Sequence, residues 1–151
     1  SLDITGTFSM QGRVYRGGIP VIFTLSEAYK PSAQTTDVLG LNFNLSVTYT
    51  GTYAITTNQL RYLNLTSASG KSITVDGAKT LNALMLRGGD VVQDGEIKVG
   101  DASLIGTYYG QSISTDPDAN FDGKVNIFDL ALVGGNFGLN SVTAYDEEWT
   151  P

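Results

Sequence analysis

A repeat in the C-terminal third most constrains what this 151-residue chain can fold into. The stretch from Asp90 to Asp101 aligns without gaps with the stretch from Asp118 to Asp129, 28 residues later. The similarity continues beyond each stretch, where Leu104-Ile105-Gly106 corresponds to Leu132-Val133-Gly134. A unit this short cannot bury a hydrophobic face alone, so we expect the two copies to pack together as one small module.

The second copy has the residue pattern of a calcium-binding loop of the EF-hand kind. Such a loop takes side-chain oxygens from positions 1, 3 and 5, a backbone carbonyl from position 7 and a carboxylate from position 12, with glycine at the sharp turn at position 6. Here Gly123 stands at position 6. The predicted ligands are Asp118, Asn120, Asp122, the carbonyl of Lys124, and Asp129. Val125 at position 8 is expected to enter the core and pair with its counterpart in the other loop.

The first copy keeps most of this pattern. Its predicted ligands are Asp90, Asp94, the carbonyl of Glu96, and Asp101. Val92 stands at position 3 and has no side-chain oxygen, so a water or a backbone carbonyl takes that place, or the site binds weakly. Alternatively, this loop keeps its shape and has lost the metal. We predict two calcium ions, with the first held less tightly.

Each loop is expected to lead into a helix. Apolar residues then recur at helical spacing, and we expect most of them in the core. They are Leu104, Ile105 and Tyr108 after the first loop, and Leu130, Leu132, Val133 and Phe137 after the second. Gly110 and Gly138 suit helix ends.

Charge divides the chain at about residue 88. Residues 1–87 hold seven bases and four acids, whereas residues 88–151 hold eleven acids and two lysines, giving formal charges of +3 and −9 that sum to the overall −6. This asymmetry predicts two modules, 1–87 and 88–151. The first is too weakly basic to indicate nucleic-acid binding, and no apolar run is long enough to span a membrane.

Catalysis is the function class that the composition favours least. The chain has no cysteine and no histidine, which excludes thiol nucleophiles, zinc sites of the usual kind and the commonest general base. The carboxylates that could form an acid–base pair are accounted for by the metal sites. We therefore predict that this protein is not an enzyme.

Residues 1–87 are predicted to be all β. About seven short strands separated by turn residues are typical of a β-sandwich. The predicted strands are Leu2–Met10, Val21–Leu25, Leu39–Leu45, the hairpin Val47–Thr50 with Tyr53–Thr56 across Gly51-Thr52, Leu60–Leu65, Ser72–Val75 and Leu81–Leu86. At the other end of the chain, Tyr145 or Trp149 is expected to tie the tail back onto the fold.

The two loop–helix repeats over residues 88–140 resemble a type I-like dockerin. The resemblance implies a small α module of two calcium-loop (F-hand) repeats that binds a cohesin, monomeric when free. It also implies a location outside the cell or at its surface, in a polysaccharide-degrading (cellulosome-type) assembly. The segments Gly6–Arg13 and Gly51–Ile55 more loosely resemble the carboxypeptidase regulatory-like or transthyretin-type sandwiches, or X-modules, that precede dockerins.

The resemblance also implies which residues contact the partner. They are loop positions 10 and 11 and a pair one helical turn later: Val99, Gly100, Gly106, Thr107, Ile127, Phe128, Gly134 and Gly135. This predicts an apolar, small-residue surface, whose two halves differ too much for equivalent binding in two orientations. Two alternatives remain. The module could be a calcium-stabilised terminus, with Ile127 and Phe128 packed on the chain's own β-module. The sandwich could instead bind carbohydrate through tyrosines 15, 29, 49, 53 and 62.

Overall fold

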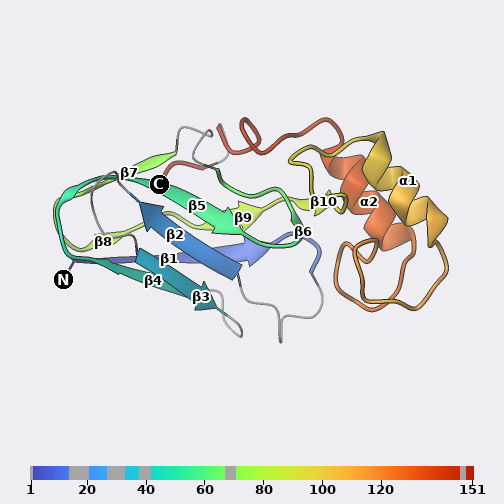
Figure 1. Cartoon of the computed structure of the whole chain (residues 1–151), viewed down its shortest axis with the longest axis horizontal. Coiled ribbons are helices and arrows are strands. Elements are labelled where there is room, and N and C mark those ends of the chain that lie inside the picture. The colour runs from blue at the N-terminus through green and yellow to red at the C-terminus, as the bar shows by residue number, and fades with distance from the viewer. Residues whose placement is uncertain (1, 14–20, 27–32, 38–41, 67–70, 147–148) are drawn as a thin grey trace.

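The protein is described here from a computed structural model that covers residues 2–13, 21–26, 33–37, 42–66, 71–146 and 149–151. Strands occupy one end of the molecule and two helices the other, with β6 and β10 between them (Figure 1). Both chain ends lie on the strand side (Figure 1). Among the residues described, no helix is long and apolar enough to cross a membrane.

Two four-stranded sheets are present in the described part of the N-terminal region. In the first, β1 (Leu2–Met10) pairs antiparallel with β4 (Asn42–Val47) and parallel with β8 (Lys79–Thr80) and β9 (Leu84–Leu86). In the second, all neighbours are antiparallel, in the order β3 (Ala33–Asp37), β2 (Val21–Ser26), β5 (Gly51–Asn58) and β7 (Ser72–Val75).

Alternate residues of these strands meet in one core. β1 buries Ile4 and Phe8, and β4 buries Phe43, Leu45 and Val47 while exposing the residues between them. Apolar side chains of β5 and β7 belong to the same buried cluster. The predicted strand Leu2–Met10 is therefore confirmed, and its buried residues Ile4 and Phe8 mark the face that it turns inward.

The predicted hairpin across Gly51-Thr52 is wrong. β4 pairs with β1, whereas β5 pairs with β2 and β7 in the other sheet. Both strands bury alternate side chains, and opposite sheets allow those two apolar faces to meet. Within the predicted strand Leu60–Leu65, only the two-residue β6 (Arg61–Tyr62) is a strand. Residues 39–41 of the predicted strand Leu39–Leu45 lie outside the described residues. β3, β8 and β10 were missed because these short segments show no apolar alternation.

The predicted helices follow the two loops. α1 spans Val99–Thr107 and α2 spans Ile127–Asn136, so each begins at the tenth residue of its loop. The position-12 carboxylates, Asp101 and Asp129, accept the backbone N–H of the N-cap residues Lys98 and Asn126 (N···O 2.8 Å each). Each carboxylate therefore starts its helix as well as facing its loop.

Position 8 of each loop is buried, but the predicted pairing of one with the other is wrong for the backbone. Ile97 N–H donates to the Leu139 carbonyl (2.9 Å), and Gly138 N–H donates to the Ile97 carbonyl (2.7 Å). Val125 makes the equivalent two bonds with residues 110–111. Gly110 and Gly138, which follow the two helices, have left-handed φ values of 87° and 88°. Each turns the chain back along the loop of the other copy, so each copy forms backbone hydrogen bonds with the other.

The strand region and the helical region are joined by hydrogen bonds. β10 (Gly88–Asp90) pairs with β6, so the first loop begins in a strand attached to the N-terminal region. Gln11 Oε1 accepts from Gly88 N–H (3.2 Å) and from Asn136 Nδ2 (2.6 Å). The division into modules after residue 87 remains a prediction.

The C-terminal tail returns to the strand region. The buried Tyr145 hydroxyl donates to the Leu63 carbonyl (2.6 Å) and accepts from Arg87 N–H (2.9 Å). The buried Trp149 indole N–H donates to the Asn82 carbonyl (3.0 Å). Both aromatic residues therefore tie the tail back onto the fold, as predicted.

Candidate metal centre and docking surface

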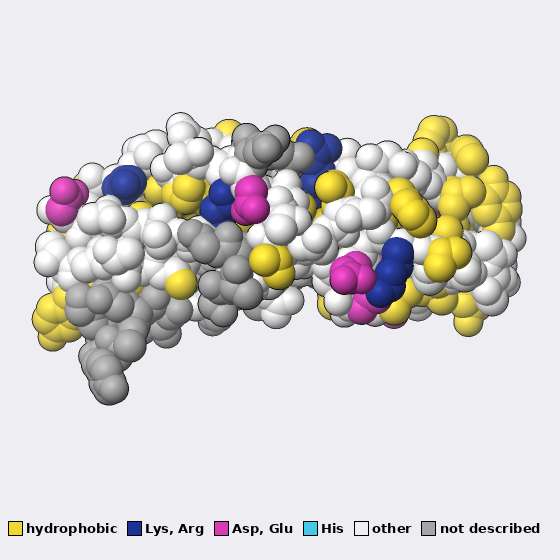
Figure 2. All heavy atoms as spheres, turned by 90° about the horizontal axis from the view of Figure 1, so that it is seen from above, with side chains coloured by type: hydrophobic (Ala, Val, Ile, Leu, Met, Phe, Trp, Pro, Cys, Tyr) yellow, Lys and Arg dark blue, Asp and Glu magenta, His cyan; other side chains and the backbone are white. Residues whose placement is uncertain are grey.

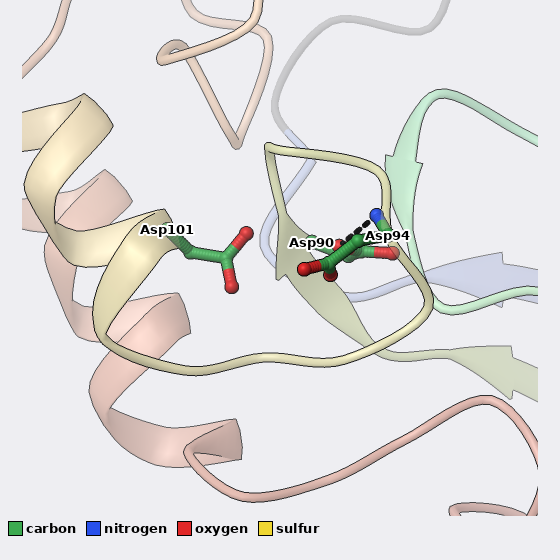
Figure 3. A group of neighbouring side chains, drawn as sticks. All are labelled: Asp90, Asp94 and Asp101. Atoms are coloured by element: carbon green, nitrogen blue, oxygen red, sulfur yellow. Dashed lines mark hydrogen bonds between the residues drawn. The ribbon is translucent and has the colours of Figure 1, made fainter.

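Three carboxylates of the first loop converge. Asp90 comes from β10, Asp94 from the turn and Asp101 from the first turn of α1, and they point toward one another (Figure 3). One oxygen from each lies within 4.8 Å of the others. Asp90 and Asp101 are buried, whereas Asp94 is exposed.

The second loop brings together Asp118, Asp122 and Asp129 within the same 4.8 Å. Its hydrogen bonds repeat those of the first loop. Asp118 accepts the N–H groups of Asp122 (3.2 Å) and Gly123 (2.9 Å), as Asp90 accepts those of the equivalent residues 94 and 95 (3.2 and 3.0 Å). The sequence repeat is thus also a repeat of backbone geometry.

Two residues of each loop have left-handed backbone conformations. At position 6 both glycines have φ 83°, which a residue with a Cβ adopts at a cost. At position 4 the residues are not glycine, yet Gln93 and Phe121 both have φ 62°. These turns fold the chain around the point on which the carboxylates converge. The same turns place Glu96 and Lys124, whose carbonyls are the predicted position-7 ligands, directly after the glycines.

Electrostatically, each cluster favours a cation. Burial, together with the neighbouring carboxylates and against the opposing effect of backbone N–H donors, raises the pKa of Asp90 to about 6 and that of Asp118 to about 6. Burial also raises the pKa of Asp129. Buried like charges oppose ionisation unless a positive charge lies between them. An oxygen-only donor set of this kind fits a hard cation such as calcium.

The first loop differs from the second in two residues near its carboxylates. Val92 at position 3 is 47% exposed and offers no oxygen, whereas Asn120 in the second loop is buried. The second difference was not predicted from the sequence: Lys98 Nζ lies 2.7 Å from Glu96 Oε2 and 3.5 Å from Asp94 Oδ2. A lysine beside a ligand carboxylate competes with the metal for it, and the second loop has Asn126 at the equivalent position.

All the residues predicted to contact a partner are exposed. They are Val99, Gly100, Gly106, Thr107, Ile127, Phe128, Gly134 and Gly135. Val99 (68%), Ile127 (56%) and Phe128 (64%) are among the most exposed large hydrophobic side chains. Hydrophobic side chains gather over the helical end of the face shown in Figure 2.

Two residues expected in the core are on the surface instead. Tyr108 is 38% exposed and Phe137 is 58% exposed. The neighbouring Tyr109 is also exposed (52%). Tyr108 and Phe137 stand at the C-caps, where the helix ends and its apolar face no longer sets the direction of the side chain. The exposed apolar surface is therefore larger than the predicted partner-contact residues alone provide.

The region that contains the repeat also matches the model of a known family. The model of that family, described as the dockerin type I domain, matches residues 88–137. Residues 88–137 are a dockerin type I domain. No curated protein matches the chain.

Solved structures resemble the chain beyond the dockerin domain. One is an N-terminal interface mutant of a type II cohesin–X-dockerin complex from Acetivibrio cellulolyticus, with 21% identity and a TM-score of 0.70. A C-terminal interface mutant of the type II complex from the same organism has 18% identity and a TM-score of 0.68. Each match covers 93% of this chain and 98% of the other. At these identities the likeness concerns the fold, and it includes the strand region as well as the dockerin domain.

The structure bears on both alternatives. Ile127 and Phe128 are more than half exposed, so they do not pack on the strand region as the structural-terminus alternative required. Of the tyrosines considered for sugar binding, Tyr53 and Tyr62 are buried and Tyr49 is exposed, while residues 15 and 29 lie outside the described residues. A sugar-stacking face therefore has one exposed tyrosine among those described.

Proposed function

We propose that this chain is a calcium-dependent docking unit whose dockerin domain binds a cohesin. The observation that carries the proposal is the paired-loop geometry of residues 88–137 together with the apolar residues exposed at the helix starts. The likeness to cohesin–X-dockerin complexes supports it. On the same grounds, we propose that residues 1–87 are a sandwich-type X-module that accompanies the dockerin domain. The alternative assignment of these residues is a carboxypeptidase regulatory-like sandwich.

In this proposal each loop holds one calcium ion, the first less tightly. The ligands of the first are Asp90, Asp94, the Glu96 carbonyl and Asp101; those of the second are Asp118, Asn120, Asp122, the Lys124 carbonyl and Asp129. Bound calcium supplies the positive charge that the buried carboxylates require. The left-handed residues at positions 4 and 6 turn each loop so that its ligand oxygens point inward. Each helix begins at position 10, where Val99 and Ile127 are exposed to a partner.

The proposed docking surface consists of the exposed residues at positions 99–100, 106–107, 127–128 and 134–135. A hollow of about 390 Å³ adjoins Phe128, and it is lined from both regions by Gln11, Gly12, Asn120, Asp122, Ala131 and Leu132. A partner side chain that enters this hollow would contact both the dockerin domain and the turn after β1. The surface is apolar, so its affinity would come from buried area and shape more than from charge pairs.

The proposed role of the unit is attachment. It would anchor a protein in an assembly outside the cell or at its surface, of the kind that degrades polysaccharides, and the unit itself would catalyse nothing.

A biosensor experiment with immobilised cohesins of type I and type II tests the proposal. The chain should bind at least one of them in calcium and release it in excess EDTA. Phe128→Asp should weaken binding at least tenfold, since it places a charge in the centre of an apolar contact. Val142→Asp is the matched control, because Val142 is an exposed apolar residue (46%) outside both loops and helices. Equal losses from both variants, or binding that EDTA leaves unchanged, would contradict the proposal.

One alternative keeps specific support. The tail bonds of Tyr145 and Trp149 and the bonds of Gln11 make the dockerin domain part of one packed molecule. If calcium raises the melting temperature while no cohesin binds, the domain is a calcium-stabilised terminus.

A further inference from the structure

Side chains of the strand region contact the second calcium loop. Arg61 of β6 is 5% exposed, and its guanidinium reaches across to the dockerin domain. Nη1 donates to the backbone carbonyl of Asp118 and Nη2 to that of Ser114, both at 2.9 Å. Asp118 is position 1 of the loop, so one of these hydrogen bonds fixes the backbone where the loop begins.

Phe121, at position 4 of the same loop, is held by the same group. The Arg61 guanidinium carbon lies 4.2 Å from the ring centroid of Phe121, and that of Arg13 lies 4.7 Å from it. Tyr62 stacks on the ring, with centroids 6.2 Å apart and planes 24° from parallel. The ring is only 7% exposed, so the strand region encloses it.

Within the described part of the chain, the equivalent residue of the first loop has no matching contacts with the strand region. Gln93 has the same left-handed backbone (φ 62°) but is exposed, and its amide lies 3.4 Å from Asp116 Oδ1. The first loop is held by backbone contacts: β10, which carries Asp90, pairs with β6 opposite Arg61. The segment after α2 bonds to Ile97, and its Ser141 N–H donates to the Gly95 carbonyl (2.8 Å). The repeat is symmetric in its backbone and asymmetric in what supports it.

A left-handed conformation at a residue other than glycine is unfavourable and persists where the surroundings enforce it. Burying the Phe121 ring against two guanidinium groups and a tyrosine enforces it. The hydrogen bond from Arg61 to the Asp118 carbonyl fixes the orientation of the first peptide group of the loop. Ordering the loop before the ion arrives removes that ordering cost from the binding step. The Arg61 charge acts in the opposite direction, because it repels a cation.

We infer that Arg61 is a positioning residue for the second loop, and that it couples the calcium affinity of this loop to the strand region. The inference rests on the proposed calcium binding at residues 118–129. Lysine at position 61 keeps the charge but cannot form the two-pronged contact. Methionine removes both. The two variants therefore separate the geometric effect of the side chain from its charge.

The test measures calcium affinity in two backgrounds of the full chain, by competition with a chromophoric chelator. Asp94→Asn disables the first loop, so that the titration reports the second; Asp122→Asn does the reverse. In the Asp94→Asn background, R61K and R61M should each bind calcium about tenfold more weakly, a factor that corresponds to about 1.4 kcal/mol. In the Asp122→Asn background both should stay within about twofold of the parent, a difference within context scatter. Lys79→Met, which removes a cation of β8 remote from the loops, should change neither.

The outcomes are distinct. A selective loss at the second loop in R61K, with circular dichroism unchanged, supports positioning, and it holds even if R61M unfolds. Equal losses at both loops mean that Arg61 only supports the fold, which overturns the inference. An increase in affinity in R61M means that charge repulsion outweighs geometry, which also overturns it. If the Asp94→Asn parent binds no calcium, the proposed metal site itself is wrong, and the inference falls with it.

Discussion

Two adjacent glycines of α2 provide a test in which stability and binding should move in opposite directions. Gly134 and Gly135 lie in a helix, where glycine is less favourable than alanine by about 1 kcal/mol per residue. A Cβ added at either position meets no atom within 4 Å, so packing within the chain does not require glycine there. The double substitution to alanine should therefore stabilise the chain.

The expected gain is about 1–2 kcal/mol, since Gly→Ala at compatible sites gives about 0.4–1 kcal/mol each. This corresponds to a rise in melting temperature of about 5 °C for a chain of this size. If these residues let a partner approach the helix backbone, the two added methyl groups should weaken cohesin binding at least tenfold. Thermal unfolding and a biosensor titration on the same samples measure both effects.

Gly110→Ala is the matched control, because a Cβ there also meets open space. Its φ of 87° is left-handed, so alanine should destabilise the chain by about 1–2 kcal/mol. A loss of stability in the α2 double variant would refute the helix reasoning. A gain in stability with full cohesin binding would show that residues 134–135 lie outside the contact surface.

Three further predictions concern the loops and the tail. Val92→Asn together with Lys98→Asn should tighten calcium binding at the first loop, as judged by titration in the Asp122→Asn background, because both changes copy the second loop; an unchanged affinity would contradict this. Trp149→Ala should lower the free energy of unfolding by about 3 kcal/mol, as for other buried tryptophans, whereas Val142→Ala should leave denaturant midpoints nearly unchanged. With calcium chelated, the raised pKa values (about 6, against 3.8 for a free Asp) mean that the folded chain binds more protons than the unfolded chain between about pH 4 and 6. The contribution of Asp90 and Asp118 to stability should therefore rise as the pH falls from 7 to 5. Melting curves in EDTA should show less of this rise once both residues are replaced by Asn, and an identical pH dependence would contradict the assignment.

The two loops could be predicted from the sequence because metal geometry fixes residue types at fixed spacing. Glycine at position 6 with carboxylates at positions 1, 5 and 12 is the arrangement that a calcium loop requires, and the structure brings those carboxylates together. The role of each ligand remains a prediction. Lys98 escaped notice because its effect depends on which rotamer a long side chain adopts, and no spacing rule states that.

The strand region was less predictable. Long alternating segments such as β1 and β4 were recognised as strands, since half-burial imposes a period of two. Their partners were not, because a strand pattern says which face is buried and nothing about which edge is paired. The parallel pairing of β1 with the short β8 and β9 joins residues more than 70 positions apart.

The contacts between the two regions were the hardest to foresee. Arg61 and Phe121 lie 60 positions apart, and in the sequence each looks ordinary: a base next to a tyrosine, and an apolar residue inside an acidic loop. Only Tyr145 and Trp149 gave a signal, because large aromatic residues in a polar tail gain nothing unless they are buried.

The measurement that tests the central claim most directly is calorimetric titration of the metal-free chain with calcium. Two ions should bind, the tighter event should disappear in Asp122→Asn, and the weaker one in Asp94→Asn. A titration with no binding at the second loop would contradict the account, whereas silence at the first loop alone would mean that Val92 and Lys98 have abolished that site.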